Sequence, residues 1–183
     1  MRSFLVVALL VQLGFGPFYV FYTLHLQAHG HSGLAVGMLW GIGVLIEIAL
    51  FWQAPRLIAR LGAQRLMAWC IGLTVLRWVV TALWPESFAL MAAVQVLHAL
   101  SFAMFHACCM RRMADLFPGA LARHGQSLLY AYSSGLGGVL GAVMAAALWE
   151  FGAGQAAFLG GAIATALAWI VHVRARRSAM ASP

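Results

Sequence analysis

Six long apolar stretches dominate this sequence, each of 18 to 23 residues and each holding at most one Asp, Glu, Lys or Arg. A helix needs about 20 apolar residues to cross the hydrocarbon core of a bilayer. A mean hydropathy of +0.92 also exceeds what a soluble core can bury. The sequence therefore predicts an all-α membrane protein without a soluble domain. Its six transmembrane helices are expected at about 4–26, 35–52, 66–83, 88–110, 127–149 and 155–173.

Basic residues lie on one side of this predicted topology. The net charge is +7, and all eleven basic residues are Arg. Ten of them flank the N-terminal end, the links 53–65 and 111–126 or the C-terminal end, whereas the links 27–34, 84–87 and 150–154 hold none. Because cytoplasmic loops are enriched in Lys and Arg, we expect both termini to be cytoplasmic. This pattern favours the lipid bilayer as the partner of the charge, and no nucleic acid is predicted.

Two charged residues fall in the middle of predicted spans, Glu47 in 35–52 and Arg77 in 66–83. Burying a charge in hydrocarbon is costly, so the two side chains are expected to pair between adjacent helices. One interpretation is a purely structural ion pair. The other is that Glu47 titrates or contacts a substrate while Arg77 binds an anionic group, for which its planar guanidinium is suited.

The stretch 88–110 carries one polar and aromatic stripe. Gln95, His98, Phe102 and His106, followed by Cys109, fall on one face at helical spacing. Histidine titrates near neutral pH and can relay protons or bind polar ligands, although a lone buried His often serves packing alone. Gln95 and His98 are the stronger candidates for substrate or proton binding.

Similar stripes occur in the first and fifth stretches, and we expect them to line a common cavity. They consist of Gln12, Gly16, Tyr19 and Thr23 in 4–26, and of Gln126, just before 127–149, with Tyr130, Ser133 and Gly137 in it. The first, second, fourth and fifth helices would then surround the cavity. That grouping is typical of transporter halves built from inverted three-helix repeats. The alternative is that polar stripes only hold helices together.

The sequence lacks the patterns of an enzyme or a cofactor protein. No nucleophile with a base and no paired carboxylates are found, and no cofactor is expected. His25, His29 and His31 have a spacing that could bind a metal, but no acidic or Cys ligand joins them, so no metal site is predicted. A pore is disfavoured because no filter-like loop or ring of charge occurs.

Three segments resemble one branch of a known family. They are GMLWGIGVLIEI at 37–48, LRW at 76–78 and QVLHALSF at 95–102, supported by the regions around Tyr19 and Tyr22 and around Gln126 to Gly137. They are similar to the 3-phenylpropionic acid transporter branch of the major facilitator superfamily. The resemblance covers essentially the whole chain, but only helices seven to twelve of the family's twelve. It implies one six-helix half of a major facilitator fold.

By that resemblance, the protein is similar to proton-coupled symporters that alternate access to a central site. Glu47, Arg77 and His98 also resemble the charged constellation of the related lactose permease, which makes them the substrate and proton-coupling candidates. One departure is that no second carboxylate follows His98. The segment ARLGAQR at 59–65, with Arg60, Gly62 and Arg65, resembles a weakened cytoplasmic loop motif of the superfamily in which Ala59 replaces the Asp.

The expected function is therefore proton-coupled transport of a small organic solute, such as an aromatic or other carboxylic acid, in a bacterial inner (plasma) membrane. An alternating-access site lies between two halves. We expect transport to need an N-terminal six-helix half or a second copy. The chain would then be a fragment, the favoured reading, or a split half or a homodimer. The alternative is a non-transporting accessory or assembly protein in which Glu47 and Arg77 form only a structural pair.

Overall fold

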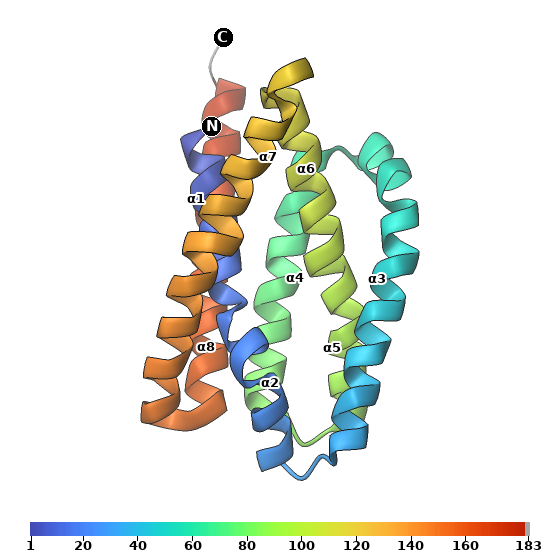
Figure 1. Cartoon of the computed structure of the whole chain (residues 1–183), viewed down its shortest axis with the longest axis vertical. Coiled ribbons are helices and arrows are strands. Elements are labelled where there is room, and N and C mark those ends of the chain that lie inside the picture. The colour runs from blue at the N-terminus through green and yellow to red at the C-terminus, as the bar shows by residue number, and fades with distance from the viewer. Residues whose placement is uncertain (182–183) are drawn as a thin grey trace.

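The computed structural model describes residues 1–181, with side chains described up to residue 178, and this part of the chain is helical without strands. Figure 1 shows an elongated bundle with both ends of the chain at the same end of the molecule. Its elements are α1 (Arg2–Gly14), α2 (Gly16–Ala28), α3 (Gly33–Leu61), α4 (Ala63–Leu83), α5 (Phe88–Ala99), η1 (Leu100–Met104), α6 (Phe105–Leu116), η2 (Gly119–Leu121), α7 (Ala122–Tyr130), η3 (Ala131–Gly137) and α8 (Gly138–Ala181).

Five helical segments in this part of the chain are long and apolar enough to cross a membrane. They are Arg2–Ala28, Gly33–Leu61, Ala63–Leu83, Phe88–Leu116 and Gly119–Ser178. The last segment contains both of the final two predicted stretches. Within α8, Gly152 and Ala153 have non-helical backbone angles, and Ala153 has a φ of 49°. The chain reverses there, and Figure 1 shows the two arms of α8 running side by side.

The two arms of α8 pack closely because glycines remove side chains from their interface. A Cβ on Gly160 would collide with the side chain of Leu148 from the other arm. A Cβ on Gly154 would likewise collide with His25 of α2. In place of the predicted polar link at 150–154, the chain has a sharp bend at two residues, Gly152 and Ala153.

The first segment is interrupted at Phe15, the one residue between α1 and α2. Pro17 has no N–H to donate to the preceding turn, which weakens the helix at this position. Gly14 and Gly16 flank the interruption, and the backbone of α8 approaches them at Gly161 and Gly141. A side chain at either glycine would separate α8 from this segment.

The link between α3 and α4 is shorter than the sequence suggested. Instead of ending near Trp52, α3 continues through Pro55 to Leu61. Gly62, with a φ of 79°, is the one non-helical residue before α4 begins at Ala63. The expected loop motif is therefore not a loop, because Arg60 lies in the last turn of α3 and Arg65 in the first turn of α4. A positive φ of this size explains why glycine occupies the link.

The bundle has a packed side and an open side. α1 and α4 pack against α8, while α3 packs mainly on α5 and only lightly on α4. Only 17% of the residues in the most apolar stretch of α3 are buried, against 44% to 50% in the corresponding stretches of the other four segments. Figure 1 shows α3 at the edge of the bundle. α3 therefore presents much of its surface to lipid or to a partner.

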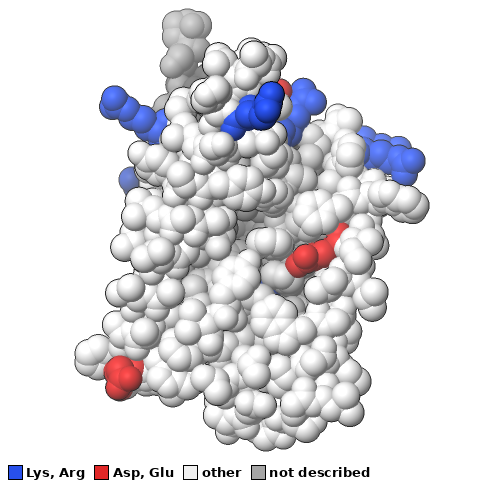
Figure 2. Space-filling model, viewed as in Figure 1, with Lys and Arg blue, Asp and Glu red and all other residues white. Residues whose placement is uncertain are grey.

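Most Arg side chains lie at one end of the long axis. Figure 2 shows Arg side chains gathered at the end of the molecule where the chain begins and ends. At the other end, the links are tied by histidines. His25 Nε2 bonds to the Thr81 carbonyl oxygen at 3.0 Å, and His31 Nε2 bonds to that of Pro85 at 2.7 Å.

Candidate functional site

Glu47 makes a short polar contact with His98 in the middle of the bundle. The Glu47 Oε1 of α3 lies 2.6 Å from the His98 Nε2 of α5, with side-chain exposures of 17% and 8%. Gly43, one turn before Glu47, allows the two helices to approach. A Cβ at Gly43 would lie 3.1 Å from Gln95 Oε1 and 3.5 Å from His98 Cδ2. The glycine therefore positions the acid against its partner.

The predicted pair between Glu47 and Arg77 is wrong. Arg77 is 1% exposed and its guanidinium instead stacks on aromatic rings, with its Cζ 4.3 Å from the ring centre of Phe18 and 4.2 Å from that of Trp78. The Phe15 ring lies at 5.5 Å. The physical reason is helix packing: because α3 packs on α5 rather than α4, Glu47 faces His98.

Arg77 is therefore a buried cation held by aromatic faces. Cation–π contacts stabilise a desolvated guanidinium, but they do not satisfy its N–H donors. Within the described residues, neither terminal nitrogen of Arg77 has a hydrogen-bond partner. An Arg in this setting has free N–H donors that can bind a planar anion such as a carboxylate.

Gln95 of α5 joins Tyr22 of α2 beside the rings around Arg77. Its Nε2 donates to the hydroxyl of Tyr22 at 2.6 Å, and both side chains are 1% exposed. The ring of Tyr22 also packs on Phe18 and on Trp40 of α3. Thr23 is exposed at the edge of this cluster, where its hydroxyl accepts a long 3.4 Å bond from Trp40 Nε1.

A row of stacked rings leads from the contact between Glu47 and His98 toward the Arg-rich end. His98 stacks on Phe102 at 5.3 Å between ring centres, and Phe102 stacks on His106 at 6.5 Å. His106 then reaches Tyr130, whose hydroxyl lies 3.4 Å from His106 Nε2. Three members of the predicted stripe, His98, Phe102 and His106, thus form a continuous row of rings. The π-helix η1 interrupts the α-helix that carries them.

The row of rings borders a cavity of about 300 Å³. Of the residues predicted to line a cavity, six lie around it: Gln12, Tyr19, Phe102, His106, Tyr130 and Ser133. Thr23 and Gln126 lie outside it, as do the glycines of the two stripes, Gly16 and Gly137. The lining consists of Ala8, Val11, Gln12, Phe15, Tyr19, Phe51, Phe102, Phe105, His106, Cys109, Leu129, Tyr130, Ser133 and Ser134. These residues come from α1, α2 and the link between them, from α3, from η1 and α6, and from α7 and η3, whereas α4 and α5 contribute none.

Two π-helical turns shape this cavity. η1 carries Phe102, and η3 carries Ser133 and Ser134. π-Helical turns within α-helices are often found at functional sites. They change which residues share a face, so the 3.6-residue period used on the sequence does not hold across them.

Several residues of the site were not singled out from the sequence. Phe15, Phe18 and Trp78 form the box around Arg77, and Tyr22 and Trp40 extend it. The available signal was the spacing of Phe15, Phe18 and Tyr22 on one helical face beside the polar stripe. Phe15 also lines the cavity, so its ring separates the cavity from the Arg77 guanidinium.

Comparison with known proteins identifies the family. The model of the MFS_1 like family matches residues 1–159. A "Probable 3-phenylpropionic acid transporter" of Escherichia coli (strain K12) is 31% identical over 111 residues, which cover 61% of this chain and 29% of that protein. No solved structure matches the chain. Together with its apolar helices, these matches show that the chain is a multi-pass integral membrane protein belonging to the MFS_1 like family.

Proposed function

We propose that this chain is the C-terminal six-helix half of a major facilitator transporter that moves a small organic acid with protons by alternating access. The two arms of α8 then count as separate spans, which completes six crossings in two sets of three. The gathering of Arg at one end supports an orientation with both ends in the cytoplasm, in a bacterial inner membrane.

The observation that carries the proposal is the buried Arg77 guanidinium, with its aromatic box and its unpaired terminal nitrogens. A carboxylate can take two N–H donors of one Arg, and an attached ring can pack on the neighbouring aromatic faces. The transporter of Escherichia coli that resembles this chain is named for 3-phenylpropionic acid. We therefore propose an aromatic carboxylic acid as the substrate class.

Access to Arg77 requires a conformational change. In this structure the rings of Phe15 and Phe18 cover the guanidinium, and the cavity ends at Phe15. The interruption between α1 and α2 lies at this residue, which allows the Phe15 ring to move without unfolding either helix. The conformation fits a closed stage of the transport cycle.

Glu47 and His98 are the proposed proton-coupling pair. When Glu47 is ionised, the 2.6 Å bond to His98 holds α3 against α5. A proton on Glu47 removes its charge and weakens that contact. The proposal thus ties protonation to the packing of the least buried helix.

The other wall of the site is proposed to come from a second six-helix half or a second copy of this chain. The alternating-access sites of such folds lie between repeats. The exposed surface of α3 is suited to that contact, since a side chain at Gly37 or Gly41 would meet no other helix within 4 Å of its Cβ. The matched region, moreover, spans 29% of the related transporter.

Uptake of labelled 3-phenylpropionate tests this proposal. The chain would be expressed alone and together with the N-terminal half of the Escherichia coli relative as a separate polypeptide. We expect uptake that an uncoupler abolishes and that Glu47→Gln lowers about tenfold or more, as loss of a charged hydrogen bond implies. Glu150→Gln is the matched control, because Glu150 lies exposed at the bend of α8 and should leave uptake unchanged.

Two results would contradict the proposal. Undiminished proton-dependent uptake in Glu47→Gln removes Glu47 from coupling. Absence of both uptake and 3-phenylpropionate-induced thermal stabilisation, in either expression arm with the chain in the membrane, argues for a non-transporting accessory protein.

A further inference from the structure

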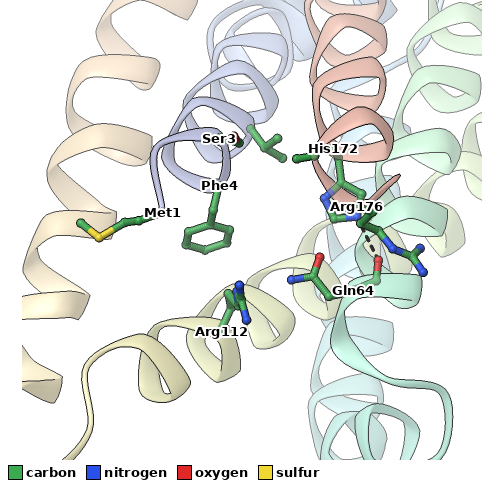
Figure 3. Close-up of a pocket in the computed structure, with 9 residues that line it drawn as sticks. Met1, Ser3, Phe4, Gln64, Arg112, His172 and Arg176 are labelled. Carbon is green, nitrogen blue, oxygen red and sulfur yellow. Dashed lines mark hydrogen bonds between the residues drawn. The ribbon is translucent and has the colours of Figure 1, made fainter. Parts of the chain in front are cut away.

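A second and larger cavity lies at the Arg-rich end of the molecule, away from the site of Glu47 and Arg77. It has a volume of about 540 Å³, within the range of small-molecule sites. Four elements distant in the sequence build it: the start of α1, the start of α4, the end of α6 and the end of α8. Figure 3 shows Gln64 lying between Arg112 of α6 and Arg176 of α8, with Phe4 projecting from α1 above Arg112.

The polar lining of this cavity is basic. It includes Arg112, Arg176 and His172, and no carboxylate of the described residues lines it. The Nε of Arg112 is buried and has no hydrogen-bond partner among the described residues. His172 Nε2 bonds to the Gln64 carbonyl oxygen at 2.9 Å, which joins α8 to α4 and leaves the two guanidinium groups for another ligand.

The acidic residues of the chain are engaged or located elsewhere. Glu47 pairs with His98, and Asp115 pairs with Arg111 at 3.1 Å. The remaining two acids lie in the link before α5 and at the bend of α8. Among the described residues, Arg112 and Arg176 thus form no ion pair within the chain. An anion from outside the chain can therefore bind to them without displacing a carboxylate of the described residues.

The other wall of the cavity is apolar. Met1, Phe4 and Val7 line it from one face of α1, at a spacing of three residues. α1 runs from the charged end into the apolar body of the bundle, so this wall continues from headgroup depth toward the hydrocarbon. A ligand that fits is amphipathic, with an anionic group at the guanidinium groups and a hydrocarbon chain along α1.

We infer that this cavity binds the phosphate group of an anionic phospholipid from the cytoplasmic leaflet. Basic pockets between transmembrane helices on that side suit phospholipid headgroups. The planar guanidinium groups of Arg112 and Arg176 supply paired N–H donors for phosphate oxygens, and α1 supplies contact for the acyl chain. A lipid at this position bridges α1, α4, α6 and α8.

Native mass spectrometry tests the inference without measuring transport. The purified chain would be equilibrated with equal amounts of phosphatidylglycerol and phosphatidylcholine in detergent, and bound lipids counted. We expect one phosphatidylglycerol to be retained preferentially, and Arg112→Gln/Arg176→Gln to lower that preference about tenfold. Arg56→Gln/Arg123→Gln is the matched control, since both Arg lie at the same end and outside the cavity; it should keep the preference of the wild type.

Several outcomes would overturn the inference. One is an equal loss of preference in both double variants, which indicates general attraction to charge. Another is full preference in the cavity variant. If inorganic phosphate displaces phosphatidylglycerol, the ligand is free phosphate and the lipid assignment is wrong. Should the cavity double variant fail to elute as a single species, Arg112→Gln and Arg176→Gln are compared singly with Arg56→Gln and Arg123→Gln, with the same expectations.

Discussion

At the residue scale, Arg77 combines a high free-energy cost of burial with a defined arrangement of aromatic rings around its guanidinium. A buried cation without a carboxylate partner carries a large desolvation penalty, which aromatic faces offset only in part. Such a residue is not explained by stability alone. Its removal should therefore separate stability from function.

Arg77→Met tests that separation. Methionine fills a similar volume and needs no hydrogen bonds, so we expect the thermal midpoint of the purified chain to stay the same or rise. Uptake of an aromatic carboxylate in the co-expressed pair should fall about tenfold or more, because a charge-assisted contact is lost. A lower thermal midpoint together with normal uptake would instead identify Arg77 as structural.

The site illustrates what the sequence predicts at this scale and what it does not. The chemical types were available from hydropathy: an acid, an Arg and a His in apolar stretches had to face the bundle interior. Their partners were not available. Glu47 meets His98 rather than Arg77 because of the rotation and packing of α3. Two of the three rings around Arg77, those of Phe15 and Phe18, come from a different segment.

At the element scale, α3 depends on few contacts. It is the least buried of the five long segments, and its approach to α5 rests on Gly43, where no side chain separates Glu47 from His98. Hydropathy identified this helix but ended it too early, because the apolar run stops at Trp52 while the backbone continues through Pro55 to Leu61. Helix ends beyond the hydrocarbon are set by capping, here by Gly62, and not by apolar length.

Replacing Gly43 by Leu should separate α3 from α5. The new side chain meets Gln95 and His98, and overpacking of this kind costs about 1–3 kcal/mol. We expect a lower thermal midpoint for Gly43→Leu. Gly41→Leu is the control two residues away, where a Cβ meets nothing within 4 Å, and the higher helix propensity of Leu should leave the midpoint equal or higher. Equal destabilisation by both variants would contradict this account of the contact.

At the scale of the whole molecule, the gathering of Arg side chains at one end of the long axis is the main guide to orientation. Charge and hydropathy agree on which ends of the helices lie together, and the structure places the chain ends and the Arg side chains at one end. What the sequence could not give is the asymmetry of the bundle, with α8 packed against α1 and α4 and with α3 left open.

Labelling with a membrane-impermeant maleimide tests the orientation. Glu150→Cys should react in intact cells, whereas Arg123→Cys should react only after permeabilisation, because the two exposed positions lie at opposite ends of the bundle. Background should be low, since Cys70, Cys108 and Cys109 are buried. The reverse pattern would place the Arg-rich end outside.

Because a single glycine joins α3 to α4, any tilt of α3 about its end at Leu61 is magnified along the helix. Glu47 lies fourteen residues before that end, 61 minus 47, or about 21 Å along the axis at the usual helical rise. A tilt of about 3° then displaces the carboxylate by about 1 Å, enough to stretch its 2.6 Å contact with His98 past hydrogen-bond length. The ends of α3 respond unequally, and the tip near Ser32 swings about twice as far as Glu47.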